Sequence, residues 1–252
     1  LSRLGQLLVS SYYLRRVLQI SIFESWRFRY DKELFNYLWS PTWRQGLIQI
    51  GGYLINNANA LVITKIGDVK VISAFLLTQR LVNMGRQFAQ APLYANLPSI
   101  VGTIGSGDFL GGFKKSIPYL RLSVVLFVIF SVLMLFAEDV FGLLRLNFTI
   151  LSRVSLVLFL GTMLLEMHHG MHAQIYMGTN KVPFLIPSLI SGMLILGLSY
   201  RLAENYGVLS VLFVQFLVQL LFNNWYPIRL NLRLSGMTVG QYLLRLINNN
   251  GK

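Results

Sequence analysis

The sequence predicts an all-α, multi-pass membrane protein, mainly because of its composition and its long apolar windows. Hydrophobic residues fill 54% of the 252 positions and charged residues only 12%, about half the charged share of an ordinary soluble domain. Several windows are apolar over enough residues to cross a bilayer, whose roughly 30 Å core requires about 20 helical residues. The net charge of +13 comes mostly from basic residues outside these windows, so nucleic acid is not an expected partner.

Six transmembrane helices are predicted, over residues 41–66, 71–103, 118–137, 150–178, 183–203 and 206–226. The connections between them are short and rich in turn residues, among them "IGDVK", "GSGDFLGGFKK", "GTNKVP" and "ENYG". Such short connections make consecutive helices antiparallel neighbours. Fifteen Lys and Arg residues fall on one side of this topology and five on the other, so the positive-inside rule places both ends of the segment in the cytoplasm.

The regions before and after the six-helix lobe at 41–226 have different characters. Residues 1–40 combine an apolar run too short to span with a mixture of aromatic and charged residues, interpreted as the end of a preceding span and an interfacial cytoplasmic linker. Residues 227–252 form a basic, amphipathic cytoplasmic tail. Cysteine is absent from the sequence, which excludes disulfides and thiolate chemistry.

Polar residues within the first two predicted helices are candidates for binding, because a polar group in lipid costs free energy unless it faces protein or water. In the first helix they recur at spacings of three and four, which aligns them on one face, although close helix packing explains such a stripe equally well. The second helix has a longer polar face. The candidates are Gln49, Asn56 and Asn59 in the first helix, and Asn83, Gln87 and Gln90 in the second.

Arg80 and Arg86 are the strongest of these candidates. A guanidinium near the middle of a membrane costs at least roughly 2.5 kcal/mol, and arginine is the natural partner of a phosphate through its paired N–H donors and permanent charge. The two residues are therefore predicted to bind an anionic substrate. A salt bridge from either one to Glu166 is the alternative explanation.

The stretch "LLEMHHGMHAQ" at 164–174 contains every histidine of the chain. At 100° per residue, Glu166 and His169 fall on the polar side of the predicted helix, whereas His168 and His172 are turned away. One ion cannot be held by all four side chains, and the other helices offer no His or Cys to complete a zinc site, so no metal is predicted. Glu166 and His169 are predicted to couple a proton or to bind a sugar.

The remaining predicted helices, the third, fifth and sixth, are almost purely apolar and are expected to form a lipid-facing shell. Gln215 and Gln219, four residues apart in the sixth, are interpreted as packing residues. Gly192 and Gly197 in the fifth are attributed to close helix contact.

Residues 35–226 resemble the second half of polysaccharide-biosynthesis (O-antigen) flippases of the multidrug/oligosaccharidyl-lipid/polysaccharide exporter superfamily. The likeness lies in the order of loose motifs: a helix that opens with Arg44 and Gly46, "IGD" before a second helix that ends near "AP…P", and the Thr-Asn-x-x-Pro-Phe turn at 179–184. It implies two MATE-like six-helix lobes around a central cavity that work by alternating access. The chain would be the C-terminal lobe, with the N-terminal lobe missing, and Arg80 and Arg86 would correspond to cationic cavity residues.

The expected function is therefore export of an anionic lipid-linked oligosaccharide across the bacterial cytoplasmic (inner) membrane, without covalent catalysis and without a cofactor. Coupling to H⁺ or Na⁺ is left open. Two alternatives remain: a multidrug exporter of the same superfamily, and an intramembrane metal-dependent enzyme that uses Glu166 and the histidines. The expected partners are the lipid-linked oligosaccharide, membrane lipids and the N-terminal lobe.

Overall fold

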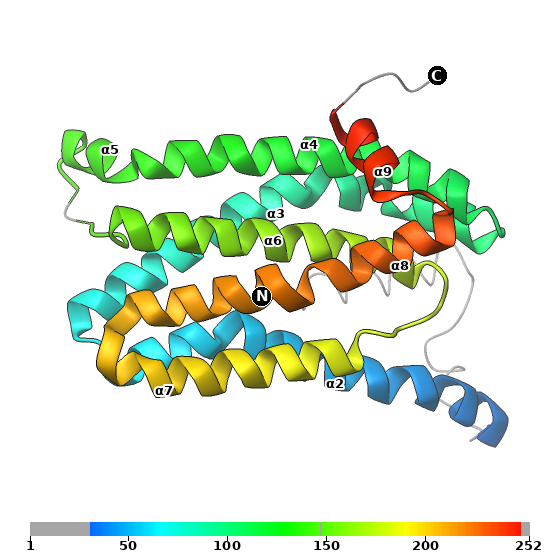
Figure 1. Cartoon of the computed structure of the whole chain (residues 1–252), viewed down its shortest axis with the longest axis horizontal. Helices are drawn as coiled ribbons and strands as arrows, with labels where there is room; N and C mark the ends of the chain where they lie inside the picture. Colours follow the sequence, from blue (N-terminus) through cyan, green and yellow to red (C-terminus); the bar gives the residue numbers. More distant parts are fainter. Residues whose placement is uncertain (1–30, 147, 248–252) are drawn as a thin grey trace, which may run out of the picture. The chain divides into compact units, whose positions relative to one another are not determined.

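The computed structural model describes residues 31–146 and 148–247, and these are all-α, as predicted, with no strand among them (Figure 1). The predicted end of a preceding span lies outside the described residues, as does most of the interfacial linker. The helices are α2 (Lys32–Ile66), α3 (Val69–Gly105), α4 (Phe109–Leu135), α5 (Ala137–Leu143), α6 (Arg153–Met177), α7 (Leu185–Val218), the π-helix η1 (Gln219–Asn223), α8 (Trp225–Ser235) and α9 (Val239–Ile247).

The chain divides into two units, residues 1–43 and 44–252. The described part of the first unit is the start of α2, where the ring of Phe35 stacks on that of Trp39 with centroids 5.5 Å apart. Because α2 begins at Lys32, the predicted boundary between linker and first span falls within one helix. The architecture and the sites described below belong to the second unit.

Three helical segments are long and apolar enough to cross a membrane, namely Phe109–Leu135, Arg153–Met177 and Leu185–Ser235. The third extends over 51 residues and contains the sixth predicted helix and all of the fifth except residues 183 and 184. The first two predicted helices are also present, as parts of α2 and α3. Most residues of each of the six predicted ranges are therefore helical, and the segments with the dimensions and composition of membrane spans lie in α4, α6 and the stretch from α7 to α8.

Gly207 divides α7 into two antiparallel halves. Its backbone has φ 65° and ψ −159°, a conformation that a residue with a Cβ atom rarely adopts. The chain reverses there, so that the yellow and orange halves of α7 lie on opposite sides of the turn in Figure 1. This residue ends the sequence "ENYG", which was predicted to connect the fifth and sixth helices.

In two other predicted connections, an aspartate side chain caps the helix that follows. Asp68 in "IGDVK" accepts a hydrogen bond from the backbone N–H of Val71 at 2.8 Å. Asp108 in "GSGDFLGGFKK" accepts one from the N–H of Gly111, also at 2.8 Å. Each carboxylate satisfies a donor that has no partner within the first helical turn, which explains why α3 and α4 begin where they do.

The hydrophobic core lies where α3, α4 and α6 pack together. Phe75, Phe113 and Phe159 contribute one large, fully buried ring from each of these helices. The rings of Phe75 and Phe159 meet edge to face with centroids 5.8 Å apart, an arrangement favoured by the quadrupoles of the two rings. This packing fixes α6, which carries the functional candidates, against α3.

Gly192 and Gly197 of α7 provide a test of how closely α7 approaches α2. A Cβ atom on Gly192 would lie 2.9 Å from Leu54 Cβ and 3.2 Å from the Gly51 carbonyl oxygen, whereas one on Gly197 would have nothing within 4 Å. The sequence prediction of close contact therefore holds for Gly192 and is wrong for Gly197. We expect Gly192→Ala to lower the free energy of unfolding by about 1–3 kcal/mol through overpacking.

The matched control is Gly197→Ala, which should leave the stability unchanged or raise it slightly through the better helix propensity of alanine. Thermal unfolding of the detergent-solubilised variants, followed by circular dichroism, measures both effects. Equal melting temperatures for the two alanine variants would contradict the close approach of the helices.

Candidate functional site

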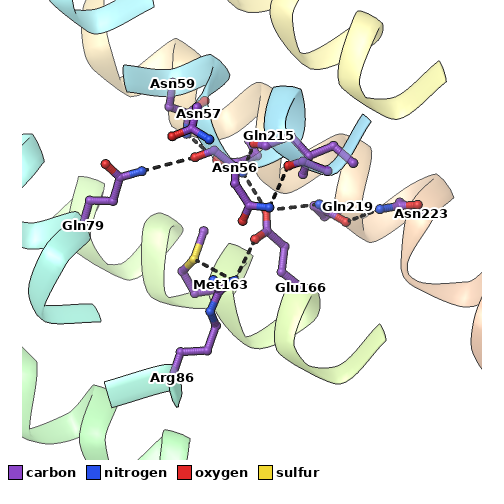
Figure 2. A network of polar contacts seen from close by, with 12 residues as sticks. Asn56, Asn57, Asn59, Gln79, Arg86, Met163, Glu166, Gln215, Gln219 and Asn223 are labelled. Carbon is purple, nitrogen blue, oxygen red and sulfur yellow. Dashed lines mark hydrogen bonds and ion pairs between the residues drawn. The ribbon is translucent and has the colours of Figure 1, made fainter. Parts of the chain in front are cut away.

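Polar side chains from three helices and the π-helix converge on Glu166 in the second unit (Figure 2). The Glu166 side chain is 3% exposed, and its Oε2 lies 3.2 Å from Nη1 of Arg86 on α3. Its Oε1 accepts hydrogen bonds from Nε2 of Gln215 at 2.7 Å and Nε2 of Gln219 at 3.2 Å. Both carboxylate oxygens are thus satisfied, as a buried charge requires.

A second set of hydrogen bonds holds these amides in place. Asn59 Nδ2 donates to Oε1 of Gln215, whose Nε2 also donates to the Ile55 carbonyl oxygen at 3.0 Å. Asn223 Nδ2 donates to Oε1 of Gln219 at 3.1 Å. Because the oxygen of each glutamine accepts a hydrogen bond, its NH₂ group is left to face Glu166, and the carboxylate meets only donors.

Gln215 and Gln219 correct the sequence interpretation of the sixth predicted helix as part of a lipid-facing shell. They are 1% and 0% exposed, and they contact Glu166 rather than serve as packing residues. Asn223 extends the spacing of four residues. These three polar residues at intervals of four, in an otherwise apolar helix, were the available signal. The sequence alone could not show that their partner on another helix is Glu166. The repeat ends in the π-helix η1, a feature often found at functional sites.

Arg86 has binding capacity beyond its ion pair. Its side chain is 22% exposed, its Nη1 also lies 3.9 Å from Met163 Sδ, and its Nε is buried without a partner among the described residues. The salt bridge to Glu166 that the sequence analysis left as the alternative is therefore present. The guanidinium nevertheless keeps an unused N–H donor.

A cavity of about 310 Å³ adjoins the Arg86–Glu166 pair. It extends from this pair toward the end of α6 and the start of α7, where Met177 and Phe184 line it. His169 lies on its wall. The cavity brings together six of the predicted site residues, Gln49, Asn56, Arg86, Gln90, Glu166 and His169, and adds Gln174 and Asn223.

The other predicted site residues lie elsewhere. Asn59 is buried and donates a hydrogen bond to Gln215, which in turn donates one to Glu166. Arg80 and Gln87 are exposed on α3, Asn83 is half-buried there, and none of the three lines the cavity. The structure therefore distinguishes the two arginines that the sequence analysis treated together.

His168 and His172 contact the C-terminal helix α9. The Tyr242 hydroxyl lies 3.0 Å from Nε2 of His168 and 2.8 Å from Nε2 of His172, and Asn231 of α8 donates to Nδ1 of His172 at 3.0 Å. Because Nδ1 of His172 accepts, its Nε2 carries the proton and donates to Tyr242, whose own proton is directed to His168. Burial raises the pKa of the Tyr242 phenol, which keeps that proton in place.

These contacts hold His172 in the interior, where its side chain is fully buried. The glutamate and the three histidines of the "LLEMHHGMHAQ" stretch therefore lie in two separate environments. Glu166 and His169 are at the cavity, and His168 and His172 are at α9. Within residues 31–146 and 148–247, no group of three or more His, Cys, Asp or Glu side chains is placed to hold a metal ion.

Comparison with protein-family models, with curated proteins and with solved structures gave no match for this chain.

Proposed function

We propose that this chain forms one lobe of a membrane transporter that moves an anionic lipid-linked oligosaccharide, such as a polysaccharide repeat unit, across the bacterial inner membrane. The observation that carries the proposal is the cavity beside the Arg86–Glu166 pair, which lies between apolar helices and is lined by amides, an imidazole and a guanidinium. A chain that needed only a stable core would gain little from such a pair, because replacing a buried ion pair with apolar residues is often neutral or stabilising.

The chemistry of the cavity suits a phosphorylated sugar. Sugar hydroxyls donate and accept hydrogen bonds, as the side-chain amides of Gln49, Gln90 and Asn223 also do. Arg86 offers the fixed N–H donors that a phosphate accepts, and its buried Nε has no partner among the described residues. In this mechanism, substrate phosphate competes with Glu166 for the guanidinium.

Exchange of the Arg86 partner would also provide a means of ion coupling. When phosphate takes the guanidinium, Glu166 loses its counter-charge and binds H⁺ or Na⁺ instead, with His169 on the same wall of the cavity. The ion and the substrate would then bind in the same event. The six helices cross the membrane with both ends of the segment in the cytoplasm, and alternating access occurs against a second lobe.

The rival functions fit the cavity less well. A site for cationic drugs needs a carboxylate free to bind a cation, and Glu166 is paired with Arg86 at 3.2 Å. A metal-dependent enzyme would need Glu166 to share an ion with the histidines, whereas His168 and His172 contact Tyr242 instead.

The proposal is tested by complementation of a bacterial strain from which the gene for this protein has been deleted, with the amount of surface glycan as the measured quantity. We expect Arg86→Met combined with Glu166→Gln to reduce surface glycan at least tenfold, because this double variant keeps the cavity uncharged and intact but cannot hold phosphate. Arg201→Ala is the control, since Arg201 is exposed on α7 and does not line the cavity. Normal surface glycan from the double variant, at equal amounts of membrane protein, would overturn the proposed function.

A further inference from the structure

A second cavity, of about 950 Å³, lies between α4, α6, α8 and α9. We refer to it as the α8 groove. Its lining residues all belong to the part of the chain that the structure describes, and none of them also lines the cavity at Glu166. Its volume is at the upper end of the range for small-molecule sites, roughly 300–1,000 Å³, and the mechanism proposed above does not use it.

Apolar side chains form most of the α8 groove. Ile228 and Leu232 of α8 are 5% and 7% exposed and lie in its floor. Val124 of α4 and Leu165 of α6 extend the lining to the middle of two helices that are long and apolar enough to span a membrane. From Trp225 to Arg233, both in the lining, α8 rises by roughly 12 Å, so the groove has the length and polarity to hold part of an acyl chain.

The charges in the α8 groove are of one sign. Arg229 and Arg233 line it, four residues apart on α8, and both are exposed. Among the described lining residues there is no Asp or Glu. Two guanidinium groups on one helical face, with no acid beside them, are complementary to a phosphate diester at the headgroup level of a membrane.

Helix α9 places these arginines near a membrane surface. It is amphipathic: Val239 and Leu243 line the groove and are 60% and 49% exposed, Leu244 is 62% exposed outside the groove, and Tyr242 is buried against α6. An amphipathic helix of this kind lies in the interface between headgroups and acyl chains. The mouth of the α8 groove, which α9 borders, therefore lies at the depth of lipid phosphates.

We propose that the α8 groove is a binding site for an anionic membrane phospholipid, with an acyl chain along α8 and the phosphate on Arg229 and Arg233. This inference is independent of the proposed transport substrate. A lipid held here would also contact Tyr242 and so support the attachment of α9.

The experiment is lipid retention by the purified full chain in detergent, measured by native mass spectrometry after incubation with equal amounts of phosphatidylglycerol and phosphatidylcholine. We expect phosphatidylglycerol to be retained at least fivefold over phosphatidylcholine, and Arg229→Gln/Arg233→Gln to abolish that preference, because a basic residue at an anionic surface contributes about fivefold in affinity. The control is Lys70→Gln/Arg201→Gln, which removes two exposed charges outside the groove and should retain the preference.

A second variant tests the apolar part. Val124→Trp places a large ring in the α8 groove and should reduce the retention of both lipids, while circular dichroism checks that the helices remain intact. Equal retention of the two lipids by the unaltered chain would overturn the proposal, as would an unchanged preference in Arg229→Gln/Arg233→Gln. Cross-linking that shows a second copy or another protein seated in the groove would also overturn it.

Discussion

Arg86→Met alone is expected to lower the free energy of unfolding by about 3–5 kcal/mol, since removing one partner of a buried ion pair leaves an uncompensated charge. Glu166 would keep its hydrogen bonds from Gln215 and Gln219 but lose the positive charge at 3.2 Å. Methionine approximates the length of the arginine stem, so the packing against α6 changes little. Thermal unfolding in detergent, followed by circular dichroism, measures the loss.

Two further variants isolate the charge effect in Arg86→Met. Adding Glu166→Gln should recover part of the lost stability, because the amide carries no charge and its oxygen can still accept the hydrogen bonds from Gln215 and Gln219. Arg80→Met, on the same helix but at an exposed position, should change the stability by less than about 0.5 kcal/mol. If Arg86→Met and Arg80→Met unfold at the same temperature, the Arg86–Glu166 pair does not stabilise the buried site.

Tyr242→Ala is expected to detach α9 from the rest of the second unit. The side chain is 2% exposed, it contacts both His168 and His172 through its hydroxyl, and its ring stacks on Phe113 with centroids 6.1 Å apart. Removing a buried aromatic ring costs about 3–5 kcal/mol, more than a helix as short as α9 recovers from its own hydrogen bonds. Faster tryptic cleavage at Arg245, measured by mass spectrometry, would report the release.

Tyr242→Phe and Leu244→Ala serve as comparisons for Tyr242→Ala. The phenylalanine variant keeps the ring and loses the hydroxyl, so its cost should be about 1–3 kcal/mol. Leu244 is 62% exposed, and its alanine variant should leave the rate of tryptic cleavage unchanged. Slow cleavage of Tyr242→Ala, at the rate of the unaltered chain, would show that α9 is attached by contacts other than Tyr242.

The helices could be predicted from the sequence because their signals are local. Long apolar windows and the turn residues of "IGDVK" and "ENYG" fix most of the helix ends, and Asp68 and Gly207 act within one or two turns of their own positions. The helix α5 was not predicted, because its residues lie in a connection with no clear hydrophobic period. The start of α2 before Pro41 was interpreted as part of an interfacial linker, because its mixture of aromatic and charged residues is typical of the headgroup region, whereas α2 continues through it.

The candidate site was predicted only in part, because its geometry depends on contacts between helices. The 100° rotation per residue separates Glu166 and His169 from the other two histidines, and the structure places the two pairs in different surroundings. The same rotation separates Arg80 from Arg86, but the sequence does not show which direction faces the cavity. Tyr242 had no sequence signal as a partner, since it lies 70 residues from His172.

The π-helix η1 sets the rotational phase between the two groups of polar contacts. Gln215 and Gln219 reach Glu166 before or at the π turn, and Asn231 reaches His172 after it. A π turn accommodates one more residue than an α turn, so a deletion of one residue within Gln219–Asn223 can be absorbed by conversion of η1 into an α turn, which keeps Asn231 at His172. A deletion of one residue in α8 before Asn231 has no wider turn to absorb it and would rotate Asn231 away from His172 by roughly 100°, which makes η1 the place where this helix tolerates a change in length without separating the two groups.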